Sequence, residues 1–341
     1  MSALLLLLVV SLPDADEAAF VKDAPISGRS AGEAVPRLLA IAQSPAAADG
    51  VRTHAMLKLA RIGDAAAVRP LIALADENDP IGRAALKALV QFGPVAVEAE
   101  PKFLAALAAT DSDRRALAAE GLVRLAAVSG SSLGAVATSL GDPQLRPQTL
   151  AVLPEAPESV RIALAPRLMR LLESDDAVAA AASLPPTEPA ADAVFDLLVR
   201  SLGTPDAGPI AETLAAMGKP GRQRLVRLLA GDPASQLLAL RALRGATVDP
   251  DVFRPLLEAE PSVAVEAALR LIGEPKADAI VVDALGGSRR TARDVAASLA
   301  GRTLPPDLAV TLRRLRDNPA APRQQRKLAE RALKRTVSST P

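Results

Sequence analysis

The sequence has 341 residues, and because half of them are hydrophobic, disorder is excluded for most of the chain. It contains 40 basic and 39 acidic residues but no cysteine, which excludes a disulfide, a thiolate zinc site and a cysteine nucleophile. Ala and Leu dominate, and the only aromatic residues are five Phe, so the composition favours an all-α protein and leaves strands unsupported.

The first predicted element is an apolar run, ALLLLLVVSL, over Ala3 to Leu12. Its length matches the apolar core of a secretory signal and is too short to span a bilayer. No Lys or Arg precedes it and no small-x-small cleavage site follows it, so an apolar helix that caps the repeats is the alternative. We expect residues 1–25 to be a signal peptide and linker of an exported protein, periplasmic or secreted; a capping helix would indicate a cytoplasmic one. No other segment is long and apolar enough to cross a membrane.

Helical stretches rich in Ala and Leu then end at glycine every 27 to 30 residues along much of the chain. That period is typical of an array of helical hairpins. The glycines are Gly63, Gly93, Gly218, Gly245, Gly273 and Gly301.

The clearest hairpin runs from Ala65 to Gly93. Apolar residues at steps of three and four predict one buried stripe on each of its two helices. The first stripe is Val68, Leu71, Ile72 and Leu74, and the second is Ile81, Ala85, Leu86, Leu89 and Phe92.

The turn of this hairpin contains Asp76 and Asp79. We expect Asp79 to cap the second helix and Pro80 to occupy its first turn, where the missing N–H costs nothing. Gly93 is expected to end that helix in a left-handed conformation, and Pro94 to prevent its continuation.

Similar helix starts follow downstream at Asp111 with Asp113, at Asp232 with Pro233, and at Glu260 with Pro261. The last of these helices is predicted to bury the stripe Val265, Leu269 and Ile272. Between residues 141 and 189 eight prolines predict short helices, apart from a long one at about 158–173.

The turn residues, the following Arg83 and the ending AALKALVQFG resemble a HEAT-repeat α-solenoid of the short-repeat kind, also called phycobilisome-lyase-type HEAT-like repeats. The resemblance covers about residues 30–320, with a poor fit around 141–189. The resemblance implies a protein with interaction surfaces and a role in assembly. A minority of the members of this family are enzymes or are associated with enzymes. The residues that define the repeat are Asp76, Asp79, Pro80, Arg83, Leu86, Leu89 and Gly93.

We therefore expect an all-α, right-handed superhelix of about nine or ten antiparallel helix pairs over residues 26–320, with the second helices on a concave face. Residues 321–341 are expected to form a basic C-terminal capping helix and tail.

Candidate catalytic residues are few. His54, the only histidine, has no cysteine partners for a metal site, and its neighbours Thr53 and Arg52 look exposed. The acidic pairs, Asp76 with Asp79, Asp111 with Asp113 and Asp175 with Asp176, stand at predicted helix starts, where capping explains them. There is no phosphate-binding loop and no nucleophile elbow. We predict no catalytic residue, no cofactor and no metal site.

Basic residues gather toward the end of the sequence: residues 289–341 hold 13 Lys and Arg against four Asp and Glu, whereas residues 1–288 hold 27 against 35. The final helix has Leu328, Ala332 and Leu333 as its apolar stripe. It is either a solvated capping helix or an anion-binding tail. The basic residues are Arg313, Arg314, Arg316, Arg323, Arg326, Lys327, Arg331, Lys334 and Arg335.

A second basic group falls on two successive predicted helices, where its guanidinium groups could lie near one another or be dispersed over the surface. Its members are Arg222, Arg224, Arg227, Arg241 and Arg244.

The function that the sequence favours is a non-enzymatic scaffold for another protein, because the expected surface is extended and carries no catalytic group. One alternative is a module that binds an acidic partner, nucleic acid or lipid through the basic C-terminal helix. Nucleic acid is disfavoured, since there are no aromatic residues there to stack on bases. A lesser alternative, from the resemblance, is a lyase-like enzyme accessory that handles a chromophore.

Overall fold

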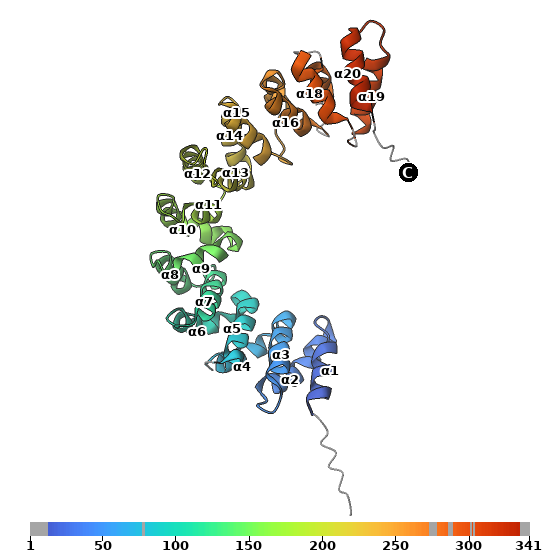
Figure 1. Cartoon of the computed structure of the whole chain (residues 1–341). Helices are drawn as coiled ribbons and strands as arrows, with labels where there is room; N and C mark the ends of the chain where they lie inside the picture. Colours follow the sequence, from blue (N-terminus) through green and yellow to red (C-terminus); the bar gives the residue numbers. More distant parts are fainter. Residues whose placement is uncertain are drawn as a thin grey trace, which may run out of the picture. The chain divides into compact units, whose positions relative to one another are not determined.

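The computed structural model describes residues 13–76, 79–272, 278–285, 289–300, 302 and 304–334. All the regular elements within these ranges are helices (Figure 1). The chain forms two compact units, Met1–Leu171 and Leu172–Pro341, which we call unit 1 and unit 2. The expected run Ala3 to Leu12, together with Gly273, Gly301 and Arg335, lies outside the described residues.

Unit 1 is a series of helix pairs in which α2 packs on α3, α4 on α5, α6 on α7 and α8 on α9. The second helices also form a continuous row, with α3 against α5, α5 against α7 and α7 against α9. Each pair therefore completes its core with its neighbours, as in an α-solenoid. The α-helices are α1 (Pro13–Asp23), α2 (Arg29–Gln43), α3 (Asp49–Ile62), α4 (Val68–Leu74), α5 (Pro80–Phe92), α6 (Glu100–Leu107), α7 (Ser112–Leu125), α8 (Gly130–Ser139), α9 (Arg146–Val152) and α10 (Glu158–Leu171), with 3₁₀ helices η1 (Ala65–Ala67), η2 (Gly93–Ala99) and η3 (Leu153–Glu155).

Unit 2 repeats the arrangement: α12 packs on α13, α14 on α15, η4 on α16, α17 on α18 and α19 on α20. Its second helices again follow one another, from α11 through α13, α15, α16 and α18 to α20. Its helices are α11 (Ala177–Ser183), α12 (Glu188–Arg200), α13 (Ala207–Ala216), α14 (Lys219–Leu228), α15 (Pro233–Ala242), α16 (Pro261–Leu271), α17 (Asp278–Ala284), α18 (Arg289–Leu299), α19 (Pro306–Asp317) and α20 (Arg323–Leu333), with the 3₁₀ helix η4 (Pro250–Glu258).

The hairpin α4–α5 confirms the predicted apolar stripes. Val68, Leu71 and Leu74 are buried on α4, and Ile72 is half-buried. All five predicted residues of α5 are buried, with the repeat-defining Leu86 and Leu89 among them.

The predicted cap of α5 is also confirmed. Asp79 Oδ1 accepts a hydrogen bond from the Gly82 N–H at 2.9 Å, and Pro80 occupies the first turn of the helix. Arg83 reaches the next pair, where its guanidinium lies 3.4 Å from Asp111, the N-cap residue of α7. Asp76 pairs instead with Lys102 of α6, so its carboxylate links two helix pairs and does not cap a helix.

The backbone conformation of Gly93 differs from the predicted left-handed helical one. Its φ of 55° is positive, but its ψ of −134° lies outside the left-handed helical region. The chain turns directly into η2, and that backbone geometry is open to glycine because it has no Cβ. Gly63, in contrast, ends α3 in the left-handed helical conformation.

The proline-rich middle matches the prediction: α9 and α11 have seven residues each, and the longer α10 lies between them with 14. The register predicted for α16 is wrong. The buried residues include Val263, Ala264 and Ala267, while Val265 and Leu269 are half-buried, because a helix rich in Ala and Leu offers two stripes of the same spacing. Glu260 precedes this helix without a side-chain capping bond.

The architecture is an all-α array of HEAT-like helix pairs. The handedness of the superhelix, the number of repeats, the concave face and the predicted domain limits stay predictions.

Candidate binding surfaces

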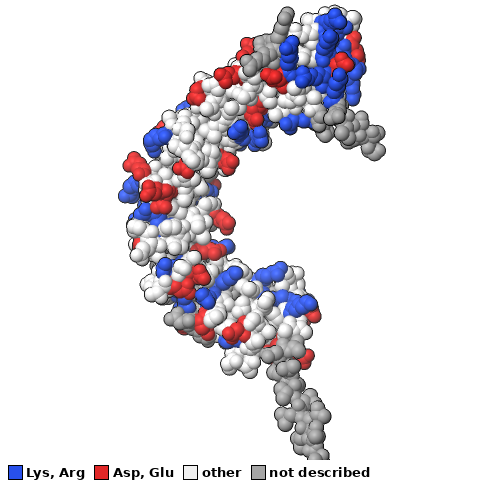
Figure 2. Space-filling model, in the orientation of Figure 1, with Lys and Arg blue, Asp and Glu red and all other residues white. Residues whose placement is uncertain are grey.

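The C-terminal basic surface consists of exposed side chains on α19 and α20. Figure 2 shows blue atoms gathered over these two helices. Leu328 and Ala332 of α20 are buried as expected, Ala329 joins them, and Leu333 is half-buried. The C-terminal basic surface has six members, and none of them forms a side-chain hydrogen bond or an ion pair with a described residue. They are Arg313, Arg314, Arg323, Lys327, Arg331 and Lys334.

Two further basic residues of this region are less available to a ligand. Arg316 donates from Nε to Asp317 Oδ1 at 2.7 Å, and this hydrogen bond lowers the pKa of Asp317. Arg326 is half-buried against the core of the helix pair. We therefore leave both out of the C-terminal basic surface.

The second basic group does not form one patch. Arg224 of α14 is buried, donates from Nε to Asp192 of α12 at 2.9 Å, and also pairs with Glu188. The hydrogen bond from Arg224 lowers the pKa of Asp192. Arg224 is therefore a link between two helix pairs, and we withdraw it as a candidate for binding.

Arg244 and Arg222 are also engaged within the protein. Arg244 Nε lies 3.0 Å from Glu266 of α16, and Arg222 donates to the Thr247 carbonyl at 3.4 Å. Arg227 and Arg241 are the two members of the group that are exposed and form no side-chain hydrogen bond or ion pair with a described residue, although the charge of Arg227 contributes to lowering the pKa of Asp192. The predicted convergence of five guanidinium groups is corrected to these two, because the others face neighbouring repeats.

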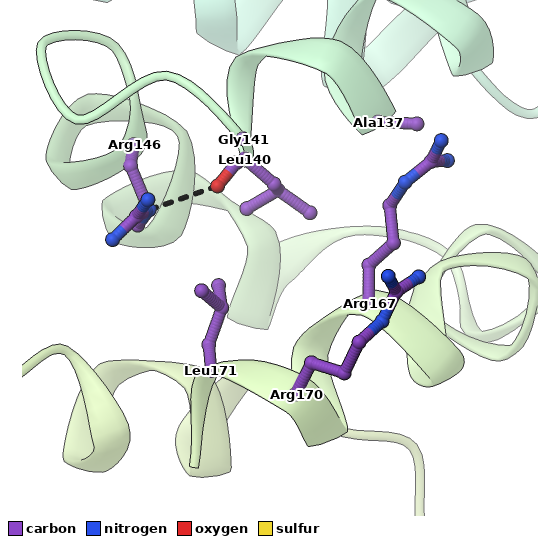
Figure 3. Close-up of a pocket in the computed structure, with 7 residues that line it drawn as sticks. All are labelled: Ala137, Leu140, Gly141, Arg146, Arg167, Arg170 and Leu171. Carbon is purple, nitrogen blue, oxygen red and sulfur yellow. Dashed lines mark hydrogen bonds between the residues drawn. The ribbon is translucent and has the colours of Figure 1, made fainter. Parts of the chain in front are cut away.

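A small cavity in unit 1 brings together three arginines that the sequence analysis did not single out. It lies between the end of α8, α9 and α10 and has a volume of about 170 Å³. Arg146 Nε donates to the Leu140 carbonyl at 2.8 Å, at the end of α8, while Arg167 and Arg170 project from α10 (Figure 3). The lining residues are Ala137, Leu140, Gly141, Arg146, Arg167, Arg170 and Leu171. Because α10 packs on α8, Arg146 of α9 lines the same cavity as the two later arginines.

Two larger grooves are mostly apolar. One, of about 540 Å³, lies between α1 and α3, and the other, of about 500 Å³, lies beside α15. Lys58 in the first groove is engaged, since its Nζ donates to the Lys22 and Ala24 carbonyls at 2.6 and 2.7 Å. The first is lined by Ala18, Val21, Lys22, Ala48, Gly50, Val51, His54 and Lys58, and the second by Leu202, Gly203, Ala207, Asp232, Ala234, Ser235, Leu237, Leu238 and Arg241.

His54 is exposed, and its Nδ1 lies 2.7 Å from the Gly50 carbonyl of its own helix. Its neighbour Arg52 is buried, contrary to expectation, because Nε donates to the Ala42 carbonyl at 3.1 Å. Of the acidic pairs, Asp111 caps α7 as predicted, whereas Asp176 stands before α11 without a side-chain capping bond.

In the part of the chain that the structure describes, no three His, Asp, Glu or Cys side chains are close enough together to hold a metal ion. No helix in those ranges combines the length and the apolar content that a bilayer crossing requires.

No protein-family model and no curated protein matches the sequence. Solved structures with similarly arranged helices include an engineered protein (TM-score 0.37, 21% identity, 89% of this chain and 99% of that one). They also include Kap121p (TM-score 0.49, 13% identity, 93% and 43%) and importin beta (TM-score 0.42, 14% identity, 94% and 53%). The chain thus spans about half or less of the length of these two. Similarity this low carries no functional conclusion, and the class of the protein, an α-solenoid of HEAT-like helix pairs, follows from its own helix packing.

Proposed function

We propose that the protein is a non-enzymatic scaffold that binds another protein through the exposed faces of its helix pairs. The observation that carries the proposal is the layered packing: each pair completes its core with its neighbours and leaves a side of its helices open to solvent. Two apolar grooves of about 500 Å³ or more on these faces are large enough to accept side chains of a partner.

The test is affinity purification of the full chain from its own cells, washed in parallel at low and at high salt. Mass spectrometry identifies bound protein, and nuclease-sensitive staining identifies nucleic acid. A defined protein that persists at high salt and forms a stoichiometric complex when purified supports a scaffold, because contacts dominated by apolar burial are little screened. Recovery of no protein, or of nucleic acid alone, contradicts it.

A second candidate function is anion binding by the C-terminal basic surface. Its six side chains are exposed and not neutralised by any described carboxylate. Binding through such charges loses affinity steeply as salt rises.

This second function is tested with a variant that neutralises four of the six charges, compared with a control that removes four exposed basic side chains elsewhere. Binding of a nucleic acid, of vesicles of acidic lipid and of an acidic peptide is measured against salt. A shallower salt slope for the variant alone supports the surface, and an equal change in both excludes it. The variant is R313Q/R314Q/K327Q/R331Q and the control is R29Q/R61Q/K87Q/R200Q.

A further inference from the structure

The cavity of Arg146, Arg167 and Arg170 carries an inference beyond a general binding surface. Three guanidinium groups line it, and none of its seven lining residues is acidic. Figure 3 shows the side chains of Arg167 and Arg170 at one end and Arg146 at the other, beyond Leu140 and Leu171. Positive charges held together in a concave space create a local potential that attracts an anion.

The three arginines differ in how many of their nitrogen atoms are hydrogen-bonded within the protein. Arg146 is half-buried and held by its bond to the Leu140 carbonyl, so it contributes a fixed charge. Among the described residues, Arg170 has one side-chain acceptor, the Pro166 carbonyl, to which Nε donates at 3.3 Å, and Arg167 has none. The terminal nitrogens of Arg167 and Arg170 are therefore available to a ligand.

The volume of the cavity and the chemistry of its lining residues restrict the class of ligand that it can bind. At about 170 Å³ the cavity is smaller than the roughly 300 to 1,000 Å³ of sites for drug-sized molecules. A guanidinium fork matches two oxygens of a phosphate or carboxylate. Ala137 and Leu140 are buried and Leu171 is half-buried, so they form an apolar wall against which a short aliphatic stem can pack.

We propose that this cavity binds one oxyanion, a phosphate or a carboxylate, carried on a side chain of a peptide segment of the partner. The proposal rests on the protein-binding function above and names the chemistry that one of its contacts recognises. Arg167 and Arg170 bind the oxygens, and Arg146 supplies positive charge at the other end of the cavity.

The test uses fluorescence anisotropy of short fluorescein-labelled Ala-Gly peptides with a central phosphoserine, glutamate or serine. The full chain is compared with R167Q/R170Q, which keeps much of the side-chain length. The control R61Q/K87Q removes from the same unit two exposed positive charges that form no ion pair with a described residue. Inorganic phosphate serves as the competitor.

We expect the phosphoserine or the glutamate peptide to bind at least about tenfold more tightly than the serine peptide, and inorganic phosphate to displace it. The tighter of the two identifies the source of the oxyanion. The R167Q/R170Q variant should lose at least about tenfold in affinity, while the control stays within about twofold of the unmodified chain.

Equal binding of all three peptides, unchanged affinity of R167Q/R170Q, or an equal loss in the control would overturn the proposal. Capture of the protein partner by the R167Q/R170Q chain separates the two claims. If the partner is still retained and no oxyanion peptide binds, the scaffold function stands and the oxyanion pocket fails.

Discussion

The repeats α4–α7 of unit 1 and α14–α16 of unit 2 are built from the same kind of helix pair but are tied together differently. In α4–α7 the arginines at the joint are only half-buried: Arg83 forms a partly exposed ion pair with Asp111, and Arg114 donates from Nη2 to the Ala75 carbonyl at 3.1 Å. In α14–α16 Arg270 is buried in the joint, donates from Nε to the Leu243 carbonyl at 3.0 Å and also to the Ala246 carbonyl, and lies 5.3 Å from the centre of the Phe253 ring. An arginine of such an array can therefore be part of the core, and its charge alone does not show that it is available to a partner.

The largest expected effect is that of Leu89→Asp in unit 1. Leu89 is fully buried, so the aspartate would be an unpaired charge in the core and should cost at least about 3 to 5 kcal/mol in the free energy of unfolding. Urea unfolding followed by circular dichroism measures the loss. The control Lys87→Asp changes an exposed residue of the same helix and should cost little. Equal unfolding of the two variants would contradict the proposed core of α5.

In unit 2 we expect Arg270→Met to cost about 2 kcal/mol, because the buried Leu243 carbonyl and the half-buried Ala246 carbonyl lose their donor. The matched control is Arg241→Met, which removes an exposed arginine without a described partner and should change stability by no more than about 0.5 kcal/mol. The same urea titration compares them. A harmless Arg270→Met substitution would mean that the joints of the two units do not differ.

A smaller difference in stability is expected between substitutions at the N-terminal ends of α5 and α16. Asp79→Ala removes the capping bond to the Gly82 N–H and should cost about 1 kcal/mol. Glu260→Ala in unit 2 removes no capping bond and should be close to neutral. Thermal melting of both variants measures the difference, and the reverse order of melting temperatures would show that the caps are assigned wrongly.

The smallest expected effect is a change of stability with pH. The hydroxyl groups of Ser129 and Ser132 donate to Glu100 and lower its pKa. A carboxylate with a lowered pKa in the folded state stabilises the protein above its unfolded pKa of about 4.3, and this contribution disappears as the pH falls through the lower folded value. Urea unfolding from pH 7 to pH 3 should therefore show the stability gap between the unmodified chain and Glu100→Gln narrowing below about pH 4.3. A gap that is constant with pH would contradict this role.

Several local features of the fold could be predicted from the sequence because they depend on neighbouring residues. The stripe of α5 and the caps at Asp79 and Asp111 follow from spacing and from residue type. The register of α16 could not be predicted, since its Ala and Leu residues supply two equivalent stripes and only packing selects one.

The candidate sites were less predictable than the fold. The exposed basic side chains of α19 and α20 follow from the local sequence, whereas the burial of Arg224 and the grouping of Arg146 with Arg167 depend on helices from different repeats. No local pattern contains these contacts, because they form only when the pairs stack.

The central claim is that the arginines divide into those that join helices within the array and those that are exposed to a partner. Hydrogen exchange of the arginine Nε–H groups, measured by NMR on the full chain with assigned arginine signals, tests it most directly. We predict slow exchange for Arg52, Arg224 and Arg270, whose Nε groups donate to protein oxygens, and fast exchange for Arg227 and Arg241. Equally fast exchange in both groups would contradict the claim.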